Sequence, residues 1–261
     1  MWPPVAGSAS GRSAQLDDPA AACRDRSARR RSHQPFATVQ SVAQKKFRWR
    51  RPRHTLNGRQ SATEVDRVGV RLQLRKQQAE AGDIVLLYGD ESEALTHPYL
   101  ARAWAKAGAD LRVPAPGQAK KIAMLGSLDH VTRQLIVHTG PTKRSSDFVA
   151  HLEQLDRLYG PKPGQPITPV VLVEDNGPIH TSKLSLAALN ARAHWLTVEW
   201  LPKYAPELND IERIWHDLKA HHLAHHTFAD TDALDQAIHH AVDALNTERM
   251  VLPLARPRIS A

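Results

Sequence analysis

The sequence predicts an α/β fold in which helices pack on a mixed β-sheet. Three observations indicate this class: two apolar segments separated by a tight turn form a hairpin pattern, an amphipathic helical pattern follows them, and buried-type strands then alternate with helices. With 261 residues, the chain is long enough for one good-sized domain with appendages. One folded core with additional segments is therefore expected.

The first 44 residues show no sustained apolar period. They are rich in Ala, Ser, Pro, Arg and Gln and include the run DRSARRR at 25–31, a composition typical of disordered segments. We therefore expect a disordered segment over 1–44, a basic linker and a helix over 45–80, and the folded domain over 81–261.

Apolar periodicity and turn residues predict the elements in order. The first helix begins at a capping box formed by Ser61 and Glu64, and Gly82 is its predicted stop. The following ranges are then expected: a strand over 83–92, hairpin strands over 120–130 and 133–140, a helix over 145–160, a strand over 170–176, a helix over 182–192, a strand over 195–201, and helices over 207–222 and 230–247.

The chain carries an excess of positive charge, formally +8 at pH 7. The excess is concentrated in KKFRWRRPR at 45–53, whose six basic side chains are Lys45, Lys46, Arg48, Arg50, Arg51 and Arg53. Such a cluster favours a polyanion as the partner. A solvated basic tail is the alternative interpretation.

Cysteine usage and apolar run lengths indicate a cytoplasmic protein without a membrane partner. Cys23 is the only cysteine, which excludes an intrachain disulfide and a thiolate metal cluster. The longest apolar runs, at 84–88 and 169–173, are far shorter than the roughly 18 residues that a membrane span needs. The N-terminus lacks the charged-then-apolar order of a secretory signal.

Two buried-type strands end in carboxylates, at Asp90 and Asp175. Ligands of open α/β sheets gather beyond the carboxyl ends of strands, so the two acids could share one site. The alternative is that each acid merely begins a turn or caps the next helix. Strand alternation sends Glu174 and Asp175 to opposite faces, and the turn residue Asn176 favours Asp175 at the strand's mouth.

A third acid is expected within LPKYAPELNDIERIWHDLK at 201–219. Helical spacing places four apolar residues in one stripe: Leu208, Ile211, Trp215 and Leu218. Glu207 and Glu212 both border this stripe, so periodicity does not choose between them. Three carboxylates at one sheet edge would form a hard-oxygen site for Mg²⁺ or Mn²⁺. Two such ions can activate a water or a 3′-hydroxyl at a phosphodiester.

In this order, the motifs GDES, VEDNGPIHTS and LPKYAPELNDIERIWHDLK strongly resemble the DDE-type transposases of the bacterial insertion-sequence 630 family, relatives of the mariner transposases. The resemblance covers about residues 81–247. It implies an RNase H-like fold with helices on both faces of the sheet, two bound Mg²⁺ or Mn²⁺ ions, and DNA cleavage and strand transfer between transposon ends and target DNA. It also selects Asp90, Asp175 and Glu212 as the catalytic, metal-binding triad.

Four further residues are expected to support this triad. Glu91 matches the family pattern beside the first acid, as support and not as a ligand. His180 matches a histidine of the family motif and would orient the second acid or touch a phosphate, with helix entry or packing as the alternative. Asn176 forms the turn after the second acid. Asn209 is interpreted as a cap or turn residue that positions the helix bearing the third acid.

The N-terminal part departs from the family. Its members usually open with paired helix-turn-helix units, whose apolar pattern is missing from 1–44. We therefore expect a chain without this region, in which 45–53 holds phosphates without reading sequence. A catalytically silent remnant that binds DNA nonspecifically is the alternative; another RNase H-like nuclease, such as a junction resolvase, is disfavoured by PELNDIE. Relatives act as dimers or higher assemblies, so a homo-oligomer is possible.

The histidines after the third acid form a separate pattern. His221 and His225, and likewise His222 and His226, are spaced four apart on the predicted helix. Such pairs can chelate zinc or nickel. No nearby third ligand is evident, so a solvated helix face is the favoured interpretation.

Overall fold

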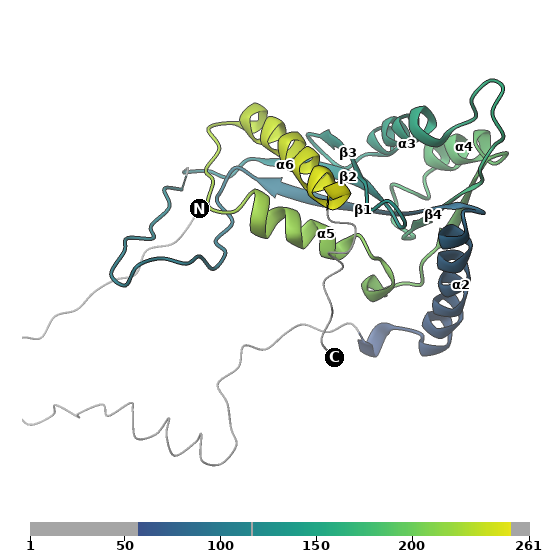
Figure 1. Cartoon of the computed structure of the whole chain (residues 1–261), viewed down its shortest axis with the longest axis horizontal. Helices are drawn as coiled ribbons and strands as arrows, with labels where there is room; N and C mark the ends of the chain where they lie inside the picture. Colours follow the sequence, from purple (N-terminus) through teal and green to yellow (C-terminus); the bar gives the residue numbers. More distant parts are fainter. Residues whose placement is uncertain (1–56, 116, 252–261) are drawn as a thin grey trace, which may run out of the picture. The chain divides into compact units, whose positions relative to one another are not determined.

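The computed structural model describes residues 57–115 and 117–251, which belong to one compact unit. Figure 1 shows its elements, which in chain order are η1 (Asn57–Arg59), α2 (Ala62–Ala81), β1 (Val85–Leu95), β2 (Lys121–Asp129), β3 (Leu135–Gly140), α3 (Ser145–Tyr159), β4 (Val170–Glu174), α4 (Lys183–Ala191), β5 (Leu196–Trp200), η2 (Pro206–Leu208), α5 (Glu212–Asp217), η3 (Leu218–His222) and α6 (Thr231–Val251). The predictions for 1–44 and for the basic stretch 45–53 lie outside these residues. None of the described helices combines the length and apolar character of a membrane span.

The five strands form one mixed sheet in the order β3-β2-β1-β4-β5. The chain enters through the antiparallel meander of β1, β2 and β3. It then crosses back, so that β4 pairs in parallel with β1 and with β5. Parallel neighbours need a crossover, and α3 and α4 lie in the two connections that provide one. The predicted hairpin and mixed sheet are confirmed.

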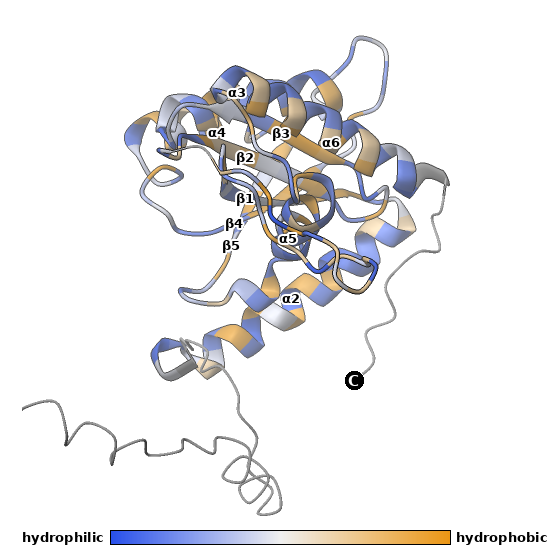
Figure 2. Ribbon diagram, turned by 90° about the vertical axis from the view of Figure 1, so that its left-hand side faces the viewer, coloured by the Kyte–Doolittle hydropathy of each residue, from blue (hydrophilic) through white to orange (hydrophobic). Residues whose placement is uncertain are grey.

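Helices cover both faces of this sheet, as predicted. Alternate residues of β1 enter different cores: Leu86 and Tyr88 pack with α2, α5 and α6, whereas Leu87 packs with α3 and α4. Both cores consist mainly of fully buried aliphatic side chains. Figure 2 shows the hydrophobic ribbon of β3 between α3 and α6. Along both helices, hydrophobic and hydrophilic residues alternate. The alternation of β1 decides which face each of its acids reaches.

Helix α2 packs on the sheet through Val68 and Leu72. It ends as predicted at Gly82, whose φ of 85° lies in the left-handed region that favours glycine. The predicted capping box is wrong. The side chain of Ser61 bonds with the hydroxyl of Thr63 and not with a backbone N–H of the helix, whereas the backbone carbonyl of Ser61 accepts from the N–H of Glu64.

The single helix predicted over 207–222 is also wrong. The structure divides this range into the 3₁₀ turn η2, the α-helix α5 and the π-helical turn η3. Pro206 begins the 3₁₀ turn, and α5 starts only at Glu212. The helix ends at His222, and His225 has a φ of 64°. The predicted histidine pairs therefore do not share a helix face, because the backbone turns between their members.

Candidate active site

Asp90 lies on β1, and Asp175 directly follows the neighbouring parallel strand β4. The parallel register pairs Tyr88 of β1 with Val173 of β4, and both side chains belong to the same core. Asp90 follows Tyr88 by two residues on β1 and so points to this face, whereas Asp175 follows Val173 by two residues just past the end of β4. This register brings the two predicted acids to one edge.

The third acid, Glu212, begins α5, which packs on the same face. Burial raises the pKa of Asp90 to about 7, with the negative charges of Glu212 and Glu91 adding to the rise. The charge of Glu212 therefore acts on Asp90. Glu207 instead accepts a hydrogen bond from Gln60 at 2.9 Å. Periodicity could not choose between Glu212 and Glu207, but their surroundings differ: the charge of Glu212 acts on Asp90, and Glu207 bonds with Gln60.

Trp215 links the helix of the third acid to the first acid. Its indole Nε1 donates to Oδ2 of Asp90 at 3.0 Å. The ring lies over Gly126, the cross-strand partner of Asp90, where an added Cβ would come within 2.5 Å of a ring carbon. Periodicity had assigned Trp215 only to the buried stripe. Its donor role requires the tertiary contact between α5 and β1, for which the sequence contains no local signal.

Asp175 is half-exposed and is held by two donors. The backbone N–H of Gly177 donates to its Oδ1 at 2.7 Å, and Nδ1 of His180 lies 2.9 Å from the same oxygen. The bond with His180 lowers the pKa of Asp175, with help from Gly177, and outweighs the opposing effect of partial burial. Asp175 is therefore kept as a carboxylate at neutral pH.

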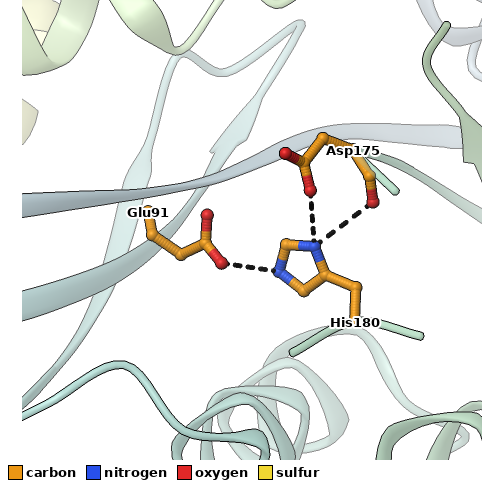
Figure 3. A group of neighbouring side chains, drawn as sticks. All are labelled: Glu91, Asp175 and His180. Atoms are coloured by element: carbon orange, nitrogen blue, oxygen red, sulfur yellow. Dashed lines mark hydrogen bonds and ion pairs between the residues drawn. The ribbon is translucent and has the colours of Figure 1, made fainter. Parts of the chain in front are cut away.

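His180 is buried between carboxylates, as Figure 3 shows. Its Nε2 lies 3.2 Å from Oε1 of Glu91 and 3.6 Å from Oε2 of Glu174, and its ring packs on Phe148 with centroids 4.7 Å apart. Burial alone would lower its pKa, but Glu174, Asp175 and Glu91 together raise it to about 11. The imidazole is therefore a buried cation.

Glu91, Asp175 and His180 lie close enough together to surround a metal ion. Both ring nitrogens of His180 already face carboxylates, and a protonated imidazole has no lone pair for a metal. These three residues therefore form an ion-pair cluster that holds the carboxylate of Asp175 in position.

Glu174 is a fully buried acid that sequence reasoning assigned only to the face opposite to Asp175. Its carboxyl lies against Gly89, where an added Cβ would come within 1.9 Å of Oε1. Burial raises its pKa to about 8; His180 opposes this rise, while Glu91, Asp90 and Asp175 add to it. Gly89, directly before Asp90, is a sequence signal for this contact, because a residue with a side chain would clash with the Glu174 carboxyl.

The two asparagines tie the acid-bearing segments to neighbouring backbone. Asn209 does not cap α5, whose N-cap residue is Ile211; its side-chain Nδ2 donates to the carbonyl of Gly89 at 2.8 Å. Asn176 donates to the carbonyl of Leu201 at 2.7 Å and so joins the ends of β4 and β5. Of the two interpretations of Asn209, the cap is wrong and the turn residue is confirmed, since its carbonyl accepts from the N–H of Glu212; its side chain adds a contact across 120 residues of sequence.

The strand order β3-β2-β1-β4-β5, with helices on both faces and acids at the adjoining edge of β1 and β4, defines an RNase H-like protein. The model of the DDE superfamily endonuclease family matches residues 85–235, and the chain belongs to this family.

Individual relatives agree with this assignment. The insertion element IS630 uncharacterized 39 kDa protein of Shigella sonnei is 27% identical over 170 residues, covering 65% of this chain and 47% of that protein. The chain thus spans about half the length of this curated relative.

Solved structures show the same fold. A Mos1 transposase paired-end complex with the left transposon end has a TM-score of 0.57 and 18% identity, covering 82% of this chain and 66% of that one. A Mos1 mariner paired-end complex with Mn has a TM-score of 0.53 and 15% identity, covering 82% and 69%.

Proposed function

We propose that this domain is the catalytic domain of a transposase, which cleaves DNA at insertion-sequence ends and transfers the strands to target DNA. The observation that supports the proposal is the parallel pairing of β1, which carries Asp90, with β4, which leads into Asp175, together with the charge of Glu212 that acts on Asp90 from the start of α5. The family assignment and the Mos1 complex with a transposon end support it.

The residues fit a divalent cation by their chemistry. Asp90 is pushed toward protonation by burial and by two neighbouring acids, a repulsion that a bound cation would relieve. The donors are carboxylate oxygens, the ligands that Mg²⁺ and Mn²⁺ prefer. We infer that Asp90, Asp175 and Glu212 hold two such ions, and the Mos1 complex with Mn supports this inference.

When bound, the ions would supply Lewis-acid activation of the attacking hydroxyl and charge stabilisation at the phosphodiester. The protein's own contribution is orientation. Trp215 fixes one oxygen of Asp90, and His180 keeps Asp175 deprotonated. Glu91 supports His180 from the other side of its ring. Asp90 and Asp175 are thus each aligned by a donor outside the triad, which is how metal ligands are commonly held.

Metal-dependent nicking of supercoiled plasmid tests this function without knowledge of the terminal sequences. Wild type should nick in Mg²⁺ or Mn²⁺, and Glu212→Gln should abolish nicking because a ligand is lost. Glu207→Gln is the matched control: it changes an acid of the same segment that does not face Asp90. DNA binding without nicking by wild type would favour the silent, nonspecific DNA-binding protein.

A further inference from the structure

Helix α2 and Gln60, which precedes it, contact the part of the chain that leads to the third acid. Gln60 donates through Nε2 to Oε1 of Glu207 at 2.9 Å, and Arg71 forms an ion pair with Glu199 at 2.6 Å. The first contact lies within the loop 201–211, and the second lies on β5, which enters this loop. The loop is therefore held by α2 at more than one point.

An ion pair joins α2 to Asp210, two residues before Glu212. Nζ of Lys76 donates to Oδ2 of Asp210 at 3.1 Å, and the two side chains are only 25% and 27% exposed. The same ammonium lies 5.5 Å from the ring centroid of Tyr88 on β1, which is a cation–π distance. A charge-assisted hydrogen bond between partly desolvated groups is stronger than one on the open surface. Asp210 is thus tied to a helix 134 residues earlier in the chain.

The residues on either side of Asp210 are fixed as well. Asn209 donates to the carbonyl of Gly89 at 2.8 Å, and Ile211 is fully buried in the core beneath α2, α5 and α6. Helix α5 has six residues, and Ile211 at its N-cap makes no side-chain cap hydrogen bond. Helices this short are not stable alone. The position of Glu212 at the start of α5 therefore depends on these three neighbouring anchors.

A second basic side chain, His130, lies farther from Asp210. Its Nδ1 is 3.9 Å from Oδ2 of Asp210, and its Nε2 is 3.5 Å from Oε1 of Glu80. Burial, and next the charge of Lys76, lower the pKa of this imidazole below its usual value, so the ring is neutral at pH 7. Lys76 is therefore both the closer and the charged partner of Asp210.

We propose that Lys76 and Asp210 are positioning residues, whose ion pair holds the start of α5 against α2 and so sets the place of Glu212 at the metal site. Neither side chain touches the metal in this role. The inference rests on the proposed function, in which Glu212 is a metal ligand. It makes α2 a support of that site.

The sign of the change in Mn²⁺ affinity separates positioning from simple electrostatics. Lys76→Met removes a positive charge, which by Coulomb's law alone would leave Mn²⁺ binding unchanged or tighten it. Loss of the contact should instead weaken Mn²⁺ binding about threefold or more. Asp210→Asn should also weaken it, and adding Asp210→Asn to Lys76→Met should cost little more, because both remove one contact. Lys76→Arg, which keeps the charge and the donors, should retain the wild-type affinity.

Hydrogen exchange in EDTA tests the same contact without metal. Backbone amides of 209–217 should exchange about threefold faster or more in Lys76→Met and in Asp210→Asn than in wild type, because local opening no longer breaks the ion pair. Asp156→Asn is the matched control. It changes the carboxylate that accepts from Nε of Arg192 at 2.9 Å, between α3 and the end of α4, and should alter neither the exchange of 209–217 nor the Mn²⁺ affinity.

Three results would each overturn the inference: unchanged or tighter Mn²⁺ binding by Lys76→Met, unchanged exchange of 209–217 in both variants, or equal effects of Asp156→Asn. If Lys76→Met melts below the assay temperature, Lys76→Gln takes its place with the same expectation. If wild type binds no Mn²⁺, the proposed function fails, and the exchange comparison alone decides whether the ion pair holds α5.

Discussion

The indole Nε1 of Trp215 donates to Oδ2 of Asp90 at 3.0 Å, so the helix that begins at Glu212 also holds the first acid of the site. Two acids separated by more than a hundred residues in sequence are thereby coupled through one short helix. A displacement of α5 would move Glu212, the proposed third ligand, and release Asp90 at the same time.

Trp215→Phe should therefore weaken metal binding. Phenylalanine retains an aromatic ring over Gly126 but lacks the donor to Asp90. Loss of a partner behind a metal ligand commonly costs about 10- to 100-fold in affinity or activity, so the Mn²⁺ concentration for half-maximal nicking should rise at least about tenfold. Trp195→Phe, in the core on the other face, should leave this concentration unchanged. Equal effects of both substitutions would contradict the account.

Replacement of His180 should have an effect that depends on pH. His180→Asn removes the cation that lowers the pKa of Asp175, so this carboxyl should be protonated at higher pH than in wild type. Mn²⁺ affinity should consequently fall more at pH 5 than at pH 8, relative to wild type. A loss that is uniform across this range would indicate a packing role alone.

Glu174 should make stability fall as pH rises. Its pKa is raised from 4.5 to about 8 in the folded protein. Between these values the folded state keeps a proton that the unfolded state releases, so stability decreases with increasing pH. Glu174→Gln lacks this proton, and its melting temperature should rise relative to wild type from about pH 5 to pH 8 and then level off. A difference in melting temperature that does not change with pH would contradict the buried protonated carboxyl.

Gly89→Ala should destabilise the fold. The added methyl group would come within 1.9 Å of the buried Glu174 carboxyl, and such overpacking costs about 1–3 kcal/mol. Gly58→Ala is the control, since nothing lies within 4 Å of the position that its methyl group would take. Urea unfolding measures both free energies. Glu174→Ala should relieve much of the cost in the double variant, and simple additivity would argue against this contact.

The sequence predicted the sheet well because its signals are local. Alternation alone assigned Val171 and Val173 of β4 to one face and Leu172 to the other, and the two cores confirm this. Gly82 ended its helix as expected because a left-handed stop needs no distant partner. Glu212 and Glu207 could not be separated in this way, since both border one helical stripe; the family resemblance was needed to select Glu212.

The contacts around the acids escaped sequence reasoning because they join distant segments. Asn209 was interpreted from its local sequence as a cap or turn residue, whereas its side chain donates a hydrogen bond to the carbonyl of Gly89, 120 residues earlier. The hydrogen bond from Nζ of Lys219 to Oγ of Ser92 depends on the π-helical turn η3, which a regular 3.6-residue period does not predict. Residue type, strand ends and the family resemblance therefore predicted the acids, but the donors that hold them depend on tertiary packing.

Binding of Mn²⁺ tests the central claim most directly, with free ion measured by electron paramagnetic resonance during titration of the protein. Wild type should remove Mn²⁺ from solution saturably, and Asp175→Asn should bind at least about tenfold more weakly because a charged ligand is lost. Equal binding by both proteins, or no binding by wild type, would contradict a metal site built on Asp90, Asp175 and Glu212.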